Sequence, residues 1–272
     1  MISKKAREWE RDMKRRVISV SGKGGAGKTM ISALLIREIL AECDRSGVGC
    51  CVLAIDADPD ANLADALGVS YEKTVGDIRE KILEEKQREI GMDIRIRFEA
   101  KIAEIMVEEH GFDLIVMGRP EGPGCYCPVN HILRAAIDAL SRNYDFTVID
   151  CEAGLEHLSR RTTQDVDVMI VVIDETMKSI RTALRLIEIA RELDVDVGNM
   201  FFVANKITTE ETKKRIEAAA RRHGIEISAF IPYDQSVARF DIEGIPVVNL
   251  PDDSPSVVAV RGIVKMVMSD DS

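Results

Sequence analysis

The chain has 272 residues, of which 46% are hydrophobic, and a formal net charge of −10 at pH 7. This size and apolar content suffice for one large domain with a substantial core, and the acidic balance argues against nucleic acid as the main partner. The sequence contains no apolar run of membrane-spanning length, and its N-terminus lacks the apolar core of a signal peptide. We therefore expect a soluble cytoplasmic protein that binds neither nucleic acid nor membrane.

Apolar periodicity predicts strands that alternate with helices along the chain. Residues 1–15 form a charged N-terminal extension to which we assign no function, and residues 16–272 form one domain. Residues 93–110 are ambiguous, because the first part alternates like a strand and the second part has helical spacing. The alternation predicts an α/β fold in which helices flank a doubly wound, mostly parallel sheet. Strands are predicted at 17–20, 51–55, 114–117, 146–150, 168–173, 200–204 and 227–231, and helices at 31–41, 62–67, 75–90, 132–140, 180–193, 210–222 and 257–268.

A phosphate-binding loop is predicted between the first strand and the first helix. Residues 22–29 follow the pattern Gly-x-x-x-x-Gly-Lys-Thr. Backbone N–H groups of such a loop surround phosphate oxygens, and the N-terminus of the next helix adds its positive dipole end. We expect Lys28 to reach the β- and γ-phosphates and Thr29 to hold Mg²⁺. The other residues expected at the nucleotide are Gly22, Lys23, Gly24, Gly25, Ala26 and Gly27.

Lys23 narrows the phosphate-loop pattern to one group of proteins. Residues 23–29 read Lys-Gly-Gly-x-Gly-Lys-Thr, which resembles the deviant phosphate loop of the ParA/MinD and nitrogenase iron protein superfamily. In that superfamily the early lysine reaches the nucleotide of the partner subunit, as an arginine finger does. The resemblance therefore implies a homodimer and a catalytic role for Lys23. The alternative is a solvated loop lysine, which the neighbouring glycines disfavour because they leave the ammonium free to point at phosphate.

Two predicted strands end in aspartate. Asp150 is the natural second holder of Mg²⁺, through water, in the Walker B role. Residues 150–154 resemble switch II of the superfamily, which implies that Gly154 senses the γ-phosphate. Residues 56–63 resemble switch I, which implies that Asp58 lies near Mg²⁺ and orients the attacking water. A single strand-end aspartate is more often a turn or helix cap, but motifs in this order are hard to explain as caps.

The expected nucleotide is ATP. Asn205 and Lys206 follow a predicted strand, as in the Asn-Lys-x-Asp motif of GTPases, but Thr208 stands where those proteins have aspartate. The acceptor that would select guanine is therefore missing. In the superfamily the strand-end asparagine contacts adenine, and a loop like that at Pro232 assists.

Cys125 and Cys127 are candidate metal ligands. Two thiolates separated by one residue supply half of a tetrahedral site, and a symmetric dimer could complete it on its two-fold axis with Zn, Ni, Cu(I) or Fe–S. The alternative is a pair of core cysteines. A loop rich in glycine and proline seldom lies in a protein core, which disfavours this alternative.

Residues 118–131 resemble the signature of the CooC family, and residues 150–158 resemble the switch II of that family. These proteins are ATPases that mature nickel-dependent carbon monoxide dehydrogenase. The resemblance implies a homodimer in which Cys125 and Cys127 of both chains bind nickel, or zinc in its absence. It also implies that nickel delivery to the apo carbon monoxide dehydrogenase is coupled to hydrolysis of ATP to ADP and phosphate.

The remaining cysteines are expected to be reduced packing residues rather than disulfide partners, since the chain lacks secretory features. These are Cys43, Cys50, Cys51 and Cys151. His131 and His157 are interpreted as structural groups and are left out of the metal site.

Two other functions are considered. One is an electron-transfer protein like the nitrogenase iron protein, with a [4Fe–4S] cluster between subunits, for which Cys151 could supply a distant ligand. The other is a ParA/MinD-type partition ATPase, which would carry a basic DNA-binding face or a basic amphipathic C-terminal helix. The close Cys-x-Cys spacing disfavours the first, and the acidic end at Asp270 and Asp271 disfavours membrane binding in the second.

Overall fold

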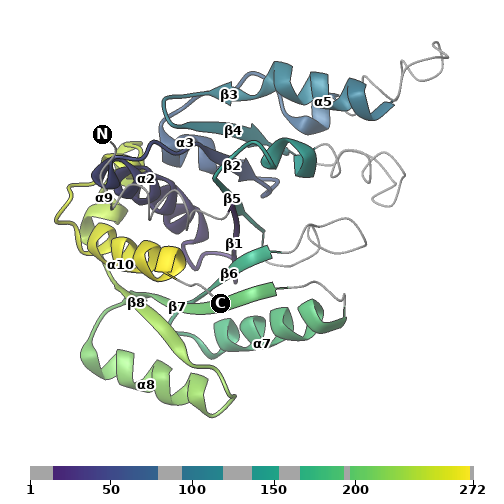
Figure 1. The fold of residues 1–272 in the computed structure, drawn as a ribbon. Helices are drawn as coiled ribbons and strands as arrows, with labels where there is room; N and C mark the ends of the chain where they lie inside the picture. The colour runs from purple at the N-terminus through teal and green to yellow at the C-terminus, as the bar shows by residue number, and fades with distance from the viewer. Residues whose placement is uncertain (1–14, 79–93, 119–136, 153–165, 193–196, 270–272) are drawn as a thin grey trace.

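The computed structural model describes residues 15–78, 94–118, 137–152, 166–192 and 197–269 (Figure 1). Its strands are β1 (Arg16–Gly22), β2 (Val52–Asp56), β3 (Val107–Glu108), β4 (Phe112–Val116), β5 (Phe146–Asp150), β6 (Val166–Ile173), β7 (Val197–Ile207) and β8 (Ile227–Pro232). They form an eight-stranded sheet in the order β3-β4-β2-β5-β1-β6-β7-β8. All neighbours in this sheet are parallel except the edge pair β3–β4. The predicted mostly parallel, doubly wound sheet is confirmed.

Helices cover both faces of the sheet (Figure 1). The helices are α2 (Lys28–Ser46), α3 (Leu63–Leu67), α5 (Ile94–Ile105), α7 (Met177–Glu192), α8 (Glu210–Arg221), α9 (Gln235–Glu243) and α10 (Pro255–Ser269), with a 3₁₀ turn η1 (Val247–Asn249). Ile18 and Val20 of β1 point into the core shared with α2 and α10, while α7 and α8 pack against the opposite face through a second core. Strands buried on both faces require continuous apolar runs, which explains the sequences of β2 and β6.

The ambiguous region resolves as a helix. Residues 94–105 form α5, so the strand-like alternation in the first part of this region does not produce a strand there. Ile102 of this helix is fully buried against Leu53 and Ile115, and this tertiary packing outweighs the local alternation. Of the helices predicted at 75–90 and 132–140, the described parts, 75–78 and 137–140, are helical. The strand β3, the helix α9 and the turn η1 were not predicted.

The cysteine assignment needs a correction. Cys43 and Cys50 form a disulfide with a Cα–Cα distance of 5.9 Å, so they are not reduced packing residues. Helix α2 ends at Ser46, and its C-cap Gly47 adopts a left-handed conformation with φ 73° and turns the chain back. That reversal brings Cys50 beside the last turn of α2. Cys51 is exposed rather than packed, whereas the Cys151 thiol is buried as expected.

The described domain begins at β1. The Arg16 guanidinium donates a hydrogen bond to the backbone carbonyl of Val267, which ties the first strand to the C-terminal helix. Residues 1–14 lie outside the described residues. Among the helices that are described, none is long and apolar enough to cross a membrane.

Candidate nucleotide site

The loop between β1 and α2 has the geometry of an anion site. Gly27 is the N-cap of α2, and no side chain caps the helix there, so the first backbone N–H groups of α2 remain available to a ligand. Gly27 has a φ of 93°, and a Cβ on it would lie 2.3 Å from Nδ2 of Asn205. A Cβ on Gly22 would lie 2.3 Å from the carbonyl oxygen of Val172. The close packing at Gly22 and at Gly27, the two ends of the loop, therefore leaves room only for glycine.

The end of β7 holds this loop in place. Asn205, only 1% exposed, donates from Nδ2 to the Ala26 carbonyl at 2.8 Å. The Lys206 Nζ donates to the Gly25 carbonyl at 2.9 Å, and its backbone N–H donates to Asn205 Oδ1 at 2.8 Å. Lys206 was not among the predicted site residues. Its position after a strand-end asparagine was the only sequence signal, because its contact with the loop is purely tertiary.

A carboxylate cluster lies at the same edge of the sheet. Because β2 and β5 are neighbours, Asp56 pairs in register with Asp150. Asp56 accepts hydrogen bonds from the backbone N–H of Leu63 at 2.8 Å and of Asp58 at 3.2 Å. Asp56 therefore organises the loop that carries Asp58, a role that was not predicted from the sequence.

Burial disfavours the ionised form of Asp56 and Asp150 and so raises the pKa of each. It raises the pKa of Asp56 to about 7, and the charge of Asp150 adds to this rise, while the Leu63 N–H opposes it. Burial also raises the pKa of Asp150 to about 6, although the hydroxyls of Thr29 and Ser32 and the charge of Lys28 lower it. A cation bound nearby would favour the ionised form of these carboxylates.

The residues present fit Mg²⁺. Asp150 Oδ1 accepts a hydrogen bond from Ser32 Oγ at 3.0 Å, whereas the buried Asp150 Oδ2 has no hydrogen-bond partner in the described part of the chain. Mg²⁺ is bound through oxygen ligands such as carboxylates and hydroxyls. Asp150 and Thr29 would hold the ion, and Asp58 is close enough for its charge to raise the pKa of Asp150.

Lys23 is engaged within its own chain. Its Nζ lies 2.7 Å from Oδ2 of Asp174, which follows β6, and the two side chains are 24% and 14% exposed. Asp174 also accepts a hydrogen bond from the backbone N–H of Thr176 at 2.9 Å. Partial burial acts to raise the pKa of Asp174, but the hydrogen bonds from Lys23 and Thr176 and the charge of Lys23 together outweigh it and lower that pKa. The prediction that Lys23 reaches a partner subunit would therefore require this pair to separate.

A cavity of about 1080 Å³ opens beside the phosphate loop. Thr29, Asn205 and Pro232 line it together with residues of α3 and α9. Sites for small molecules typically have about 300–1,000 Å³, so the cavity is large enough for a nucleotide. The cavity brings together the two residues predicted to contact the base, and Tyr233, which is 52% exposed, joins them.

Three predicted site residues lie outside the described residues, namely Cys125, Cys127 and Gly154, and so do His131 and His157, which were left out of the predicted metal site. Within the described ranges, no cluster of three His, Cys, Asp or Glu side chains could hold a metal ion. Cys151 is described, and burial raises the pKa of its thiol to about 12, which favours the neutral packing role.

Comparison with known proteins shows the family of the chain. Residues 17–247 match the CobQ/CobB/MinD/ParA nucleotide binding domain family. The chain is 45% identical over 256 residues to an uncharacterized ATP-binding protein of Methanocaldococcus jannaschii, covering 93% of this chain and 98% of that protein. It is 31% identical over 245 residues to the carbon monoxide dehydrogenase accessory protein CooC of Rhodospirillum rubrum, covering 86% and 89%. The fold is similar to that of the MinD cell division protein of Aquifex aeolicus, with a TM-score of 0.67, 21% identity and coverage of 94% and 98%.

Proposed function

Because the chain belongs to the CobQ/CobB/MinD/ParA nucleotide-binding family, we propose that it is an ATP-hydrolysing metallochaperone for a nickel-dependent carbon monoxide dehydrogenase. The observation that carries the proposal is the similarity to CooC in a chain that contains the Cys125-Tyr-Cys127 pair. The phosphate loop supplies the ATP site. The cysteine pair binds the metal ion that the protein delivers, which is nickel or, in its absence, zinc.

The chain's own residues perform the nucleotide chemistry. Backbone N–H groups of the loop and Lys28 bind the phosphates, since both lie at the first turn of α2. Asp58, held by its hydrogen bond to Asp56, orients the attacking water. Bound Mg²⁺ supplies neutralisation of the phosphate charge. Lys23 leaves Asp174 and stabilises charge on the nucleotide of a second subunit, so hydrolysis belongs to a homodimer.

The metal site is coupled to the nucleotide through β5. Asp150 ends this strand beside Thr29, and the chain then enters the predicted switch II. In the homodimer, Cys125 and Cys127 of both chains bind the metal ion with four thiolates. ATP binding brings the subunits together and changes metal affinity, a coupling worth roughly 1–3 kcal/mol. Release of nickel to the apo dehydrogenase follows hydrolysis.

The structure offers less support for the other two functions. An intersubunit iron–sulfur cluster needs accessible thiolates, whereas the Cys151 thiol is buried. A membrane-bound partition ATPase needs a free amphipathic helix, whereas α10 buries one side against α2 as part of the main core, through Val257, Val260, Ile263, Val264 and Val267.

Activation of nickel-free carbon monoxide dehydrogenase by the purified protein, Ni²⁺ and Mg·ATP tests the proposal. The wild type should activate the dehydrogenase, and Cys125→Ala/Cys127→Ala should not, although it still hydrolyses ATP. Asp58→Asn should bind ATP and nickel but fail to activate. The matched control is Cys51→Ala, which removes an exposed thiol far from the nucleotide edge of the sheet and should behave as wild type. Activation that is independent of both ATP and the cysteine pair would refute the proposal.

A further inference from the structure

Lys206, at the end of β7, has an unusual backbone conformation. Its φ is 62°, in the left-handed region that residues other than glycine rarely occupy. In the described part of the chain, Ala61 is the only other non-glycine residue with a positive φ. Asn205 Oδ1 accepts the backbone N–H of Lys206 at 2.8 Å, which holds the backbone in this conformation. Residues held in sparsely populated conformations cluster at ligand sites, so Lys206 is a candidate ligand contact.

The side chain of Lys206 is also held in place, although the residue is exposed. Its Nζ donates to the Gly25 carbonyl at 2.9 Å. Its Cε lies 3.8 Å from the position that a Cβ on Gly27 would take. The methylene stem therefore extends from the end of β7 to the phosphate loop, with the ammonium bound at its far end. Ordering a long exposed side chain costs conformational entropy, and the result is a fixed apolar surface beside the loop.

This surface belongs to the large cavity. Lys206 lines the cavity of about 1080 Å³ together with Gly27, Asn205 and Tyr233. Tyr233 is tied to the same strand end, because its backbone N–H donates to the Ile207 carbonyl at 2.9 Å. Lysine stems pack along apolar surfaces while their charged ends stay in polar surroundings. Every nucleobase offers a flat face for such packing.

The neighbouring amide indicates how a base would lie. Asn205 donates one N–H to the Ala26 carbonyl and accepts one N–H from Lys206. An amide side chain has two donors and two lone pairs, so one of each remains for a ligand. A donor and an acceptor side by side suit the polar edge of a base. A base whose edge meets Asn205 has its face beside the next side chain, that of Lys206.

We propose that the methylene stem of Lys206 covers one face of the adenine ring of bound ATP, while its ammonium stays on the Gly25 carbonyl. This inference rests on the proposed function, because it takes ATP as the occupant of the cavity. The rival role is phosphate binding by the Lys206 ammonium. That role would require Nζ to leave Gly25, and Lys28 already serves the phosphates in the proposed mechanism.

Isothermal titration calorimetry of the full chain with Mg²⁺ tests the inference with two ligands. One is a non-hydrolysable ATP analogue, and the other is inorganic tripolyphosphate, which has no base. Lys206→Ala should bind the analogue about tenfold more weakly than the wild type and bind tripolyphosphate equally well. Lys206→Met keeps an apolar stem without the ammonium, so it should bind the analogue within about threefold of the wild type. Lys206→Gly suits the left-handed backbone and replaces Lys206→Ala if that variant does not fold.

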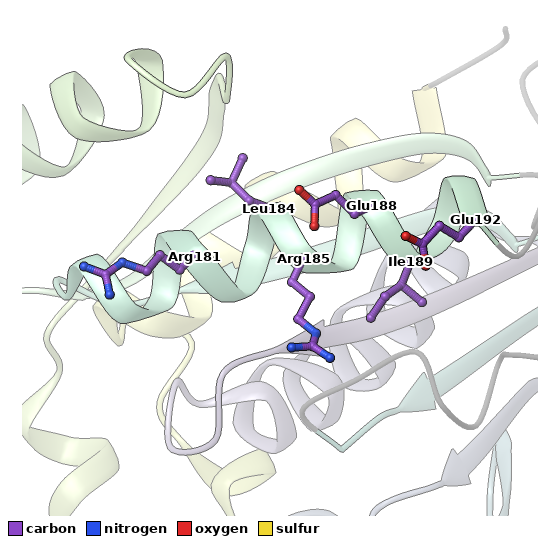
Figure 2. Close-up of a pocket in the computed structure, with 6 residues that line it drawn as sticks. All are labelled: Arg181, Leu184, Arg185, Glu188, Ile189 and Glu192. Atoms are coloured by element: carbon purple, nitrogen blue, oxygen red, sulfur yellow. The ribbon is translucent and has the colours of Figure 1, made fainter.

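The matched control is Arg185→Ala, which truncates another exposed, long cationic side chain. Arg185 lies on α7 in a smaller depression of about 300 Å³ (Figure 2), and its removal should leave the binding of both ligands unchanged.

Three results would overturn the inference and leave the nucleotide site in place. They are wild-type binding of the analogue by Lys206→Ala, equal weakening of both ligands in that variant, and a Lys206→Met that binds the analogue as weakly as Lys206→Ala does. The second would show that Lys206 acts on the phosphate loop, and the third that it acts through its ammonium. A wild type that binds the analogue no more tightly than tripolyphosphate would overturn both this inference and the proposed ATP site.

Discussion

Replacing Asp174 by asparagine should strengthen ATP-dependent dimerisation. The Lys23 ammonium is held by Asp174 within its own chain at 2.7 Å, whereas its proposed role places it at the nucleotide of a second subunit. Asparagine keeps an oxygen that can accept the hydrogen bond from the Thr176 N–H. It removes the charge that holds the lysine, and so lowers the cost of releasing it.

The size of the effect follows from the exposure of the pair. Both side chains are mostly buried, at 24% and 14% exposed, and the contact is a charge-assisted hydrogen bond. Such a partly screened pair contributes roughly 1 kcal/mol. A dimer requires two lysines to be released, so the gain is about 2 kcal/mol, which corresponds to about thirtyfold in the dimer dissociation constant.

Sedimentation velocity with a non-hydrolysable ATP analogue measures this effect. Asp174→Asn should dimerise at a concentration about thirtyfold lower than the wild type, and Lys23→Ala should fail to dimerise. The double variant should behave like Lys23→Ala, because the aspartate acts only through the lysine. If Asp174→Asn weakens dimerisation as much as Lys23→Ala does, the two side chains act as one unit in the active state and the reasoning is wrong.

Three further predictions concern other parts of the chain. Gly27→Ala should abolish ATP binding in a fluorescent-nucleotide titration, because its Cβ would lie 2.3 Å from Asn205 Nδ2. Asp234→Asn should lower the free energy of unfolding by about 1 kcal/mol at pH 7 in urea titrations, and the difference should shrink only as the pH falls below about 4. Partial burial acts to raise the pKa of Asp234, but the hydrogen bonds it accepts outweigh burial and lower that pKa, so its contribution is full above about pH 4 and is lost below the folded-state value. Cys43→Ala/Cys50→Ala should lower the free energy of unfolding by roughly 2–3 kcal/mol under oxidising conditions, with no difference from wild type in reductant.

The parts of the fold that local periodicity controls were predictable. Continuous apolar runs such as Val168–Ile173 identified buried parallel strands, and the glycine-rich loop fixed the first strand and helix. Helix α9 was missed because it is short and follows Pro232 closely, although its N-cap Asp234, which accepts from the Ser236 N–H at 2.9 Å, was a usable signal. The disulfide was missed because the spacing of Cys43 and Cys50 is informative only once the turn at Gly47 is known.

The site residues that belong to a sequence motif could be predicted. Those that reach the site only through a tertiary contact could not. Lys28, Thr29 and Asp150 lie together as their motifs indicate. The ion pair of Asp174 with Lys23 joins two strands that are adjacent only in the folded sheet. The same holds for Lys206, whose contact with the phosphate loop crosses from β7. No local pattern marks such residues, because their partners are set by strand order.

The central claim is that ATP binding and metal binding are coupled through Cys125 and Cys127. Equilibrium dialysis of Ni²⁺ against the protein, with and without Mg·ATP, measures the metal bound per dimer directly. We predict one nickel ion per dimer in the wild type, an affinity that changes when Mg·ATP is added, and no bound nickel in Cys125→Ala/Cys127→Ala, which still binds ATP. Nickel bound equally well by that variant, or with an affinity that ATP leaves unchanged, would contradict the account.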